Sequence, residues 1–386
     1  MTIKGRVMKT KKWMICLISV LLLSQLLISQ TWTAAKRLTW SVGASRYPAV
    51  AIGTGDEIHI VYEDRSPGNY EVYFKRSSNG GSTWITKRLT WSSGNSYNPV
   101  VAVDLSNHIH IVWQDNALGN NHEINHKKST DGGTNWTHKR LTYSPGDSYT
   151  PAIAIDSHNH IHLVWSDWTN DPQIYYKRST DGGTTWTTKR LTYSSGWSFM
   201  PALAIGSNDH IHLVWHDYTP GKPEVYYKKS TDGGTTWTQK RLTYSEGNSA
   251  VTSIALDSQN HIHVAWGDDT PGNYEIFYKK STNGGTSWTS KRLTYNSGWS
   301  SNPALAIDSN DYIHMVWLDD SLGSNQEIYY KRSTDGGVTW TTKRLTYSPV
   351  YSGGPAIVLD SSDNIFVVWF DYSSGNHEIY YRKGIQ

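Results

Sequence analysis

A short segment that recurs along the chain constrains the fold more than any other feature. The sequence STDGGTTW runs from Ser230 to Trp237, and close copies begin at Ser77, Ser129, Ser179, Ser281 and Ser333. The six copies lie about 51 residues apart. Similarity at such a period indicates an array of equivalent structural units. Each residue is therefore best interpreted by its place in the repeat.

Every repeat contains four strand signals. In the unit at 201–243 they are PALAI (201–205), HIHLVW (210–215), EVYYKK (224–229) and WTQKRLT (237–243). Each is short and rich in β-branched or aromatic residues, and Gly, Asn, Asp and Pro separate them. Four such strands per repeat are typical of a β-propeller blade. The sequence KRLT at the end of the fourth strand occurs seven times, so we expect seven blades.

The two ends of the chain complement each other. The last unit stops after EIYYRK (378–383) without a DGG segment or a fourth strand, whereas TWTAAKRLT (31–39) matches the internal fourth strands. The fold class predicted is therefore all-β, a seven-bladed β-propeller of four-stranded antiparallel blades in which the N-terminal strand completes the last blade. Residues 31–386 should form this one domain, with few free sheet edges.

The recurring SxDGGxTW segment resembles the Asp box, or BNR repeat, of the sialidase superfamily, and the resemblance covers the chain after residue 30. It implies that each box joins the third and fourth strands, on the face opposite the active site. The superfamily's catalytic set includes three arginines from different blades, a tyrosine with a glutamate partner and an aspartic acid. After the leader, only Arg46 and Arg65 lie outside the repeated arginine positions, and both fall in the first blade. We therefore assign no catalytic residues.

Residues 1–30 resemble an export signal. A basic segment precedes an apolar run at 13–28, which is short for a membrane span, although an uncleaved anchor is the alternative. Five of the 36 Lys and Arg lie in this leader, which leaves 31 against 33 Asp and Glu. This mildly acidic balance argues against a nucleic-acid partner. Cys16, the single cysteine, also lies in the leader. We expect a secreted or cell-surface protein without disulfides.

Two sets of residues recur at the strand ends that should form one face, called here the upper face. We call the residues at the end of the fourth strands the rim aromatics: Trp40, Trp91, Tyr143, Tyr193, Tyr244, Tyr295 and Tyr347. We call the residues at the end of the second strands the turn aspartates: Asp64, Asp115, Asp167, Asp217, Asp268, Asp319 and Asp371. Aromatic faces beside polar loops suit a sugar. Alternatively, the rings cover the blade rim and the aspartates cap their own turns.

Three tryptophans stand outside these repeated sets. Trp168, Trp197 and Trp299 lie in loops of the upper face, where a buried role is harder to supply, and we add them to the candidate ligand-binding residues.

Other repeated residues have simpler structural interpretations. The mid-strand histidines, such as His212, should be packed and hydrogen-bonded between blades. Glu224 should form a cross-strand ion pair with Arg241, worth about 0 to 1 kcal/mol. The Asp of the boxes, replaced by Asn79 and Asn283 in two copies, should accept backbone N–H bonds in its turn. We expect no bound metal and no cofactor.

Three functions remain open from the sequence. They are a non-catalytic, lectin-like binding propeller with repeated sites, a sialidase-like glycosidase, and a protein-interaction platform. The partners would be glycans or extracellular proteins, with membrane contact only through an uncleaved leader. Near identity among the repeats favours the first function, because duplicated blades duplicate their sites.

Overall fold

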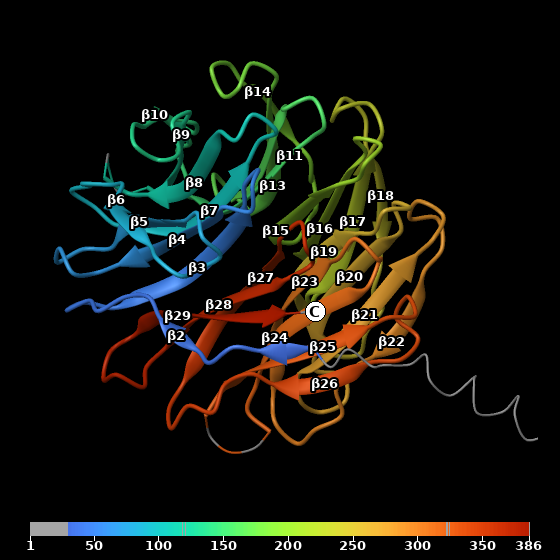
Figure 1. The fold of residues 1–386 in the computed structure, drawn as a ribbon. Coiled ribbons are helices and arrows are strands. Elements are labelled where there is room, and N and C mark those ends of the chain that lie inside the picture. Colours follow the sequence, from blue (N-terminus) through green and yellow to red (C-terminus); the bar gives the residue numbers. More distant parts are fainter. Residues whose placement is uncertain (1–29, 118, 120, 322, 324, 386) are drawn as a thin grey trace, which may run out of the picture.

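The computed structural model describes residues 30–385, with the exception of 118, 120, 322 and 324. The predicted leader, including Cys16, lies outside the described residues apart from Gln30. No helix in the described part of the chain has the length and apolar character needed to cross a bilayer. Seven antiparallel sheets are arranged as blades around a central axis (Figure 1), as the repeat predicts.

Each of the first six blades has four consecutive strands. Blade 1 contains β3 (Ser45–Ile52), β4 (Ile58–Asp64), β5 (Glu71–Ser77) and β6 (Ile85–Arg88). Blade 2 contains β7 (Ser96–Val103), β8 (Ile109–Asp115), β9 (Glu123–Ser129) and β10 (Thr137–Arg140). Blade 3 contains β11 (Ser148–Ile155), β12 (Ile161–Asp167), β13 (Gln173–Ser179) and β14 (Thr187–Arg190). Blade 4 contains β15 (Ser198–Ile205), β16 (Ile211–Asp217), β17 (Glu224–Ser230) and β18 (Thr238–Arg241). Blade 5 contains β19 (Ser249–Leu256), β20 (Ile262–Asp268), β21 (Glu275–Ser281) and β22 (Thr289–Arg292). Blade 6 contains β23 (Ser300–Ile307), β24 (Ile313–Asp319), β25 (Glu327–Ser333) and β26 (Thr341–Arg344).

Blade 7 combines both ends of the chain. It contains β27 (Ser352–Leu359), β28 (Ile365–Asp371) and β29 (Glu378–Ile385), and two short N-terminal strands, β1 (Thr31–Trp32) and β2 (Lys36–Arg37), pair with β29. Thr31 lies opposite Ile385, and Lys36 lies opposite Tyr381. In Figure 1 the blue N-terminal segment runs beside the red C-terminal strand. The predicted closure is confirmed, with the fourth strand divided into two pieces.

The core lies between neighbouring blades. All seven residues of β16 are buried, whereas β18 at the blade edge is largely exposed. Val225 and Tyr227 of blade 4 pack with Val264 and Trp266 of blade 5, and equivalent clusters recur around the ring. Burying both faces of the second and third strands explains their nearly continuous apolar and aromatic sequences.

The box segments form the turns between the third and fourth strands, on the lower face. The Gly234 amide donates to Ser230 Oγ (2.8 Å), and the Thr236 amide donates to Asp232 Oδ1 (2.8 Å). The Trp237 indole then packs edge-on against Tyr176 of the preceding blade, with ring centres 5.4 Å apart. The boxes thus hold their own turns and join adjacent blades, as predicted from their residues.

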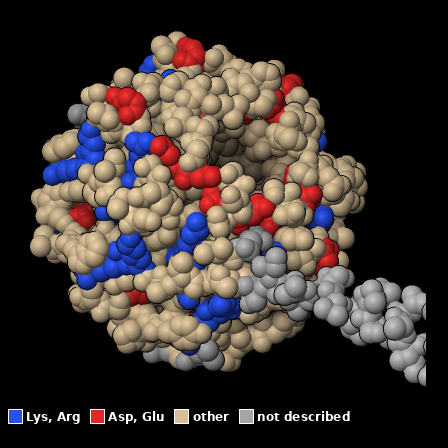
Figure 2. Space-filling model, viewed as in Figure 1, with Lys and Arg blue, Asp and Glu red and all other residues tan. Residues whose placement is uncertain are grey.

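A second set of lower-face contacts links the turns after the first strands. The Ser157 amide donates to Asp209 of the next blade (2.9 Å). Asp209 belongs to a set of turn residues with positive φ, and each accepts from the preceding blade: Asp56, Asn107, Asn159, Asp209, Asn260, Asp311 and Asp363. Ser361 of blade 7 donates to Asp56 of blade 1 (2.8 Å from the amide), so this set also closes the ring. Figure 2 shows a hollow near the centre of one face, with acidic side chains around it.

Candidate functional site

The rim aromatics are among the most exposed large side chains of the described residues. Between 69% and 77% of the surface of each is accessible. The arginine of the same KRLT segment lies over each ring, at 4.3 Å from the ring centre for Arg241 and Tyr244 and 5.4 Å for Arg88 and Trp91. Each ring therefore lies beside a cation and keeps most of its surface open to solvent.

The turn aspartates, in contrast, are engaged within the chain. Asp217 is 2% exposed and accepts hydrogen bonds from Ser198 Oγ (2.6 Å), the Thr219 amide (2.8 Å) and Trp215 Nε1 (3.2 Å). These bonds lower the pKa of the Asp217 carboxyl despite its burial, which alone would raise it. Asp115, by comparison, is half-buried. The structure places these carboxylates beneath the rim aromatics, where each holds its own turn.

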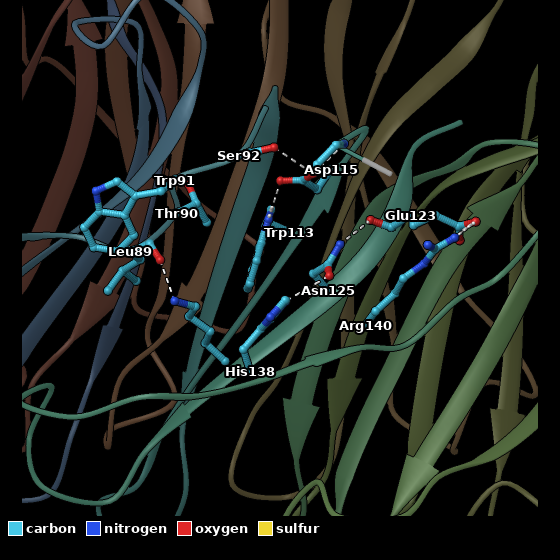
Figure 3. Close-up of a pocket in the computed structure, with 12 residues that line it drawn as sticks. Leu89, Thr90, Trp91, Ser92, Trp113, Asp115, Glu123, Asn125, His138 and Arg140 are labelled. Carbon is cyan, nitrogen blue, oxygen red and sulfur yellow. Dashed lines mark hydrogen bonds and ion pairs between the residues drawn. The ribbon is translucent and has the colours of Figure 1, made fainter. Parts of the chain in front are cut away.

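A groove between blades 1 and 2 brings a rim aromatic and a turn aspartate together (Figure 3). Trp91 lies on one side, and Trp113, Asp115 and Arg140 line the rest of a cavity of about 310 Å³. Trp113 donates from Nε1 to Asp115 Oδ2 (3.4 Å), and Ser92 Oγ donates to Asp115 Oδ1 (3.1 Å). The site is mostly apolar with a few oriented polar groups, as is usual for small-ligand pockets.

This groove differs from its equivalents because the third strand of blade 2 lacks an aromatic ring that the other blades share. At the third position of the third strand, the other blades place an aromatic ring that packs on the aromatic residue ending the second strand, for example Tyr175 on Trp165 (5.6 Å). Blade 2 has Asn125 there, and His138 stacks on Trp113 instead (5.5 Å). His138 Nε2 lies 3.0 Å from Asn125 Oδ1. Replacing an aromatic ring with a short amide opens space beside Trp91.

The electrostatics of the groove are set by partly buried cations. Lys127 donates from Nζ to the Leu89 carbonyl, and burial lowers the pKa of its amine. Burial also lowers the pKa of His138, which keeps this imidazole neutral near pH 7 and able to accept or donate a hydrogen bond. The groove thus offers amide, imidazole and ammonium groups around an apolar wall.

Equivalent grooves occur between other blades. One of about 570 Å³ lies between blades 7 and 1 and is lined by Trp40, Tyr62 and Asp64. Another of about 270 Å³ lies between blades 2 and 3 and is lined by Tyr143 and Asp167. Each contains the rim aromatic of one blade and the turn aspartate of the next. A rim aromatic and a turn aspartate from the sequence-based prediction thus line each of these grooves.

Two sequence interpretations are refined by the structure. Glu224 and Arg241 form the predicted ion pair (2.9 Å), but Glu224 is fully buried and also accepts from the Ser245 amide, so the pair is not an exposed one of small value. The mid-strand histidines of blades 2 to 6 are packed and hydrogen-bonded as predicted, with partners in their own blade. His162, for example, contacts the Tyr176 hydroxyl (2.8 Å) through Nδ1. His59 of blade 1 is buried, but among the described residues neither of its ring nitrogens has a hydrogen-bond partner, so the prediction is wrong there.

The three additional tryptophans lie on the upper face, outside the grooves described above. Trp168 and Trp197 are 37% and 48% exposed, and their ring centres are 6.1 Å apart. Trp299 is 56% exposed and packs edge-on against Tyr274. The structure thus brings two of them together and places the third in a separate pair.

One group of side chains has ligand atoms arranged closely enough to hold a metal. The ligand atoms of Asp156, His158 and His160 lie within 4.8 Å of one another, on the lower face of blade 3. Each makes protein contacts: His160 Nδ1 lies 2.8 Å from Asp156, and His158 Nδ1 lies 3.0 Å from Asp209. The sequence-based expectation of no metal did not consider this group.

Sequence reasoning missed Asn125, His138 and Trp113 as groove residues. The available signal for Asn125 and His138 was the difference between repeats, because blade 2 departs from the pattern at both positions. A search restricted to shared residues does not detect such positions.

No protein-family model matches the chain, and no curated protein sequence matches it. Solved structures do. An ulvan lyase of polysaccharide lyase family 25, bound to a glucuronic acid and sulfated rhamnose unit, aligns with a TM-score of 0.64 at 14% identity, covering 91% of this chain and 95% of its own. A Dyadobacter fermentans protein of unknown function gives 0.59 at 16%, covering 92% and 99%. A Penicillium chrysogenum α-L-arabinanase in complex with arabinobiose gives 0.57 at 13%, covering 92% and 98%. At these identities the likeness is one of fold.

Proposed function

We propose that this protein is a carbohydrate-binding propeller whose inter-blade grooves each bind a sugar. The observation that carries the proposal is the repeated placement of a solvent-exposed aromatic ring over a groove that also contains oriented polar groups. A pyranose presents a C–H face that packs on such a ring and hydroxyls that need donors and acceptors. Both requirements are met within one groove.

In the groove between blades 1 and 2, Trp91 would stack on the sugar face. His138 and Asn125 would exchange hydrogen bonds with its hydroxyls. Each site would be weak by itself, and several sites on one ring would raise the overall affinity for a multivalent glycan. The export signal expected from residues 1–30 would place the protein among extracellular glycans.

The proposal agrees with what the similar structures bind. The lyase is described with a glucuronic acid and sulfated rhamnose unit, and the arabinanase with arabinobiose. Both are carbohydrate-active proteins of the same fold. We assign no catalytic reaction to this chain.

A glycan array with the purified protein tests the proposal. We expect retention on a related set of oligosaccharides, at least a tenfold weaker signal for Trp91→Ala, and no change for Leu105→Ala, an exposed residue of the lower face. The double change Asn125→Tyr/His138→Thr copies the side chains of blade 3 and should give this groove the shape and binding preference of the smaller one between blades 2 and 3 without disturbing the fold. A blank array, or equal binding by all variants, would refute groove binding and favour a protein partner.

A further inference from the structure

The upper face contains a second feature that the repeated grooves do not explain. Six aromatic side chains form a continuous arc from blade 1 to blade 4, called here the aromatic arc: Tyr70, Tyr97, His122, Tyr149, Trp168 and Trp197. Successive ring centres are 5.2, 6.0, 4.8, 5.6 and 6.1 Å apart. Exposure increases along the arc, from a buried Tyr70 to Trp197 at 48%.

The propeller architecture does not require these rings. Tyr97 and Tyr149 occupy the second position of their first strands, where blades 5 and 6 have Ala250 and Ser301. His122 precedes the third strand of its blade, where blade 6 has Gln326. Because the same blade forms with small or polar residues at these positions, the concentration of rings in one sector needs another explanation.

The central part of the arc is held in place by a carboxylate. The His122 amide donates to Asp147 Oδ1 (2.7 Å), and His122 Nδ1 also lies 3.1 Å from it. Burial, together with a hydrogen bond to Asp147, raises the pKa of the Tyr149 hydroxyl to about 12. Fixed rings with polar atoms at their edges form a preorganised surface, which lowers the entropic cost of binding.

Two cations stand at the blade 1 end of the arc. The guanidinium groups of Arg46 and Arg65 lie over Tyr70, at 5.0 and 5.8 Å from its ring centre. They are the arginines that stand outside the repeated positions after the leader. Within the described part of the chain, Arg46 Nε is buried without a hydrogen-bond partner.

The carboxyl group nearest to Arg46 in the sheet does not remove this positive charge. Glu63 lies opposite Arg46 in the strand register and is 2% exposed. Burial raises the pKa of Glu63 to about 7, against the lowering effects of the Asn98 amide and of Arg46. Near neutral pH a large part of this carboxyl is therefore protonated, and the arginine end of the arc is left positive.

We propose that the aromatic arc binds an extended acidic polysaccharide, whose sugar rings stack along the arc and whose anionic group contacts Arg46 and Arg65. The proposal rests on the proposed function in one respect, that the ligand is a carbohydrate. It concerns a different place and a different ligand, one long chain instead of separate short glycans. The shared chemistry is an anionic sugar substituent, which a uronic acid carboxylate or a sulfate ester can supply.

The test measures affinity of the purified protein for polygalacturonate and for chondroitin sulfate by calorimetry, with neutral dextran for comparison. We expect Trp168→Ala/Trp197→Ala to bind the acidic polymers at least tenfold more weakly. Arg65→Gln should lose at least fivefold and show a smaller dependence of affinity on salt. Trp299→Ala, outside the arc, and Lys87→Gln, which removes one charge from the same blade, should bind as the parent does.

Each outcome is decisive. Binding of either acidic polymer supports the proposal. Binding of polygalacturonate shows that a carboxylate is sufficient, and binding of chondroitin sulfate alone shows that carboxylates on a polygalacturonate chain are not. Equal binding by parent and arc variants, equal loss in the two control variants, or binding of neither acidic polymer would overturn it. Failure of the groove proposal is seen separately, because Trp91→Ala and short oligosaccharides report on the grooves and leave the arc intact.

Discussion

Closure of the ring by the N-terminal segment can be tested at Trp32. The indole packs edge-on against Tyr330 of blade 6 with ring centres 5.0 Å apart, lies on the backbone of Gly384, and has Arg382 over its face at 5.9 Å. It belongs to the apolar cluster between blades 6 and 7, which includes Ile328. Truncation of Trp32 therefore removes contacts with both blades at the join.

The expected magnitude follows from the partial burial of this side chain. Replacing a fully buried Trp by Ala costs about 3 to 5 kcal/mol, so a half-buried one should cost about 2 to 3 kcal/mol. With an unfolding entropy of about 2.1 cal/mol/K per residue, a domain of about 350 residues has about 0.75 kcal/mol/K at its midpoint. Trp32→Ala should therefore lower the melting temperature by about 3 to 4 °C.

Calorimetry measures this shift, and hydrogen exchange shows where the loss occurs. We expect faster exchange at the amides of Thr33 and Lys383, which bond across the junction, with little change in blades 2 to 5. Trp91→Ala, a truncation of a tryptophan 69% exposed, is the matched control and should leave the melting temperature unchanged. An unchanged melting temperature for Trp32→Ala, with unchanged exchange in β29, would refute closure through this residue.

Two further predictions concern stability. Because burial raises the pKa of Glu63 from 4.5 to about 7, the folded state binds the proton more tightly than the unfolded chain, so the free energy of unfolding should fall by on the order of 2 to 3 kcal/mol as pH rises from 4.5 to 7. Denaturation with urea at several pH values measures this slope, which Glu63→Gln should flatten; an equal slope in the variant would contradict the assignment. Gly234→Ala should destabilise the protein by about 2 kcal/mol or more, since φ is +92° and the added Cβ would lie 2.4 Å from the Tyr176 hydroxyl. Thermal unfolding measures this, with Thr235→Ala as the control, and equal stability of the two variants would show that the box has room to adjust.

Most of the fold could be predicted from the sequence, because the repeat specifies each strand and the complementary ends specify closure. The boxes, the Glu224–Arg241 pair and the upper position of the rim aromatics also follow from local patterns. The depth of the groove at Asn125 does not, since a cavity depends on which side chains are missing and on how their neighbours repack. Nor does the full burial of Glu224, which follows from the packing of adjacent blades.

The aromatic arc shows more clearly why contacts between blades could not be predicted from the sequence. Tyr70, Tyr97 and His122 are distant in sequence from Trp168, and their contacts arise only because the blades place these strand ends side by side. A comparison of repeats would have identified the positions where blades differ. It would not have shown that those positions meet in space.

The pairing of Thr31 with Ile385 means that the two ends of the folded chain are neighbours in one sheet. A short loop could join them in the same way that the box segments join the third and fourth strands of the other blades. The fold therefore does not require the chain to begin at this particular strand. A circularly permuted protein, opened at the box of blade 4 between Asp232 and Gly233, would keep every sheet as well as the Ser361–Asp56 contact between blades 7 and 1.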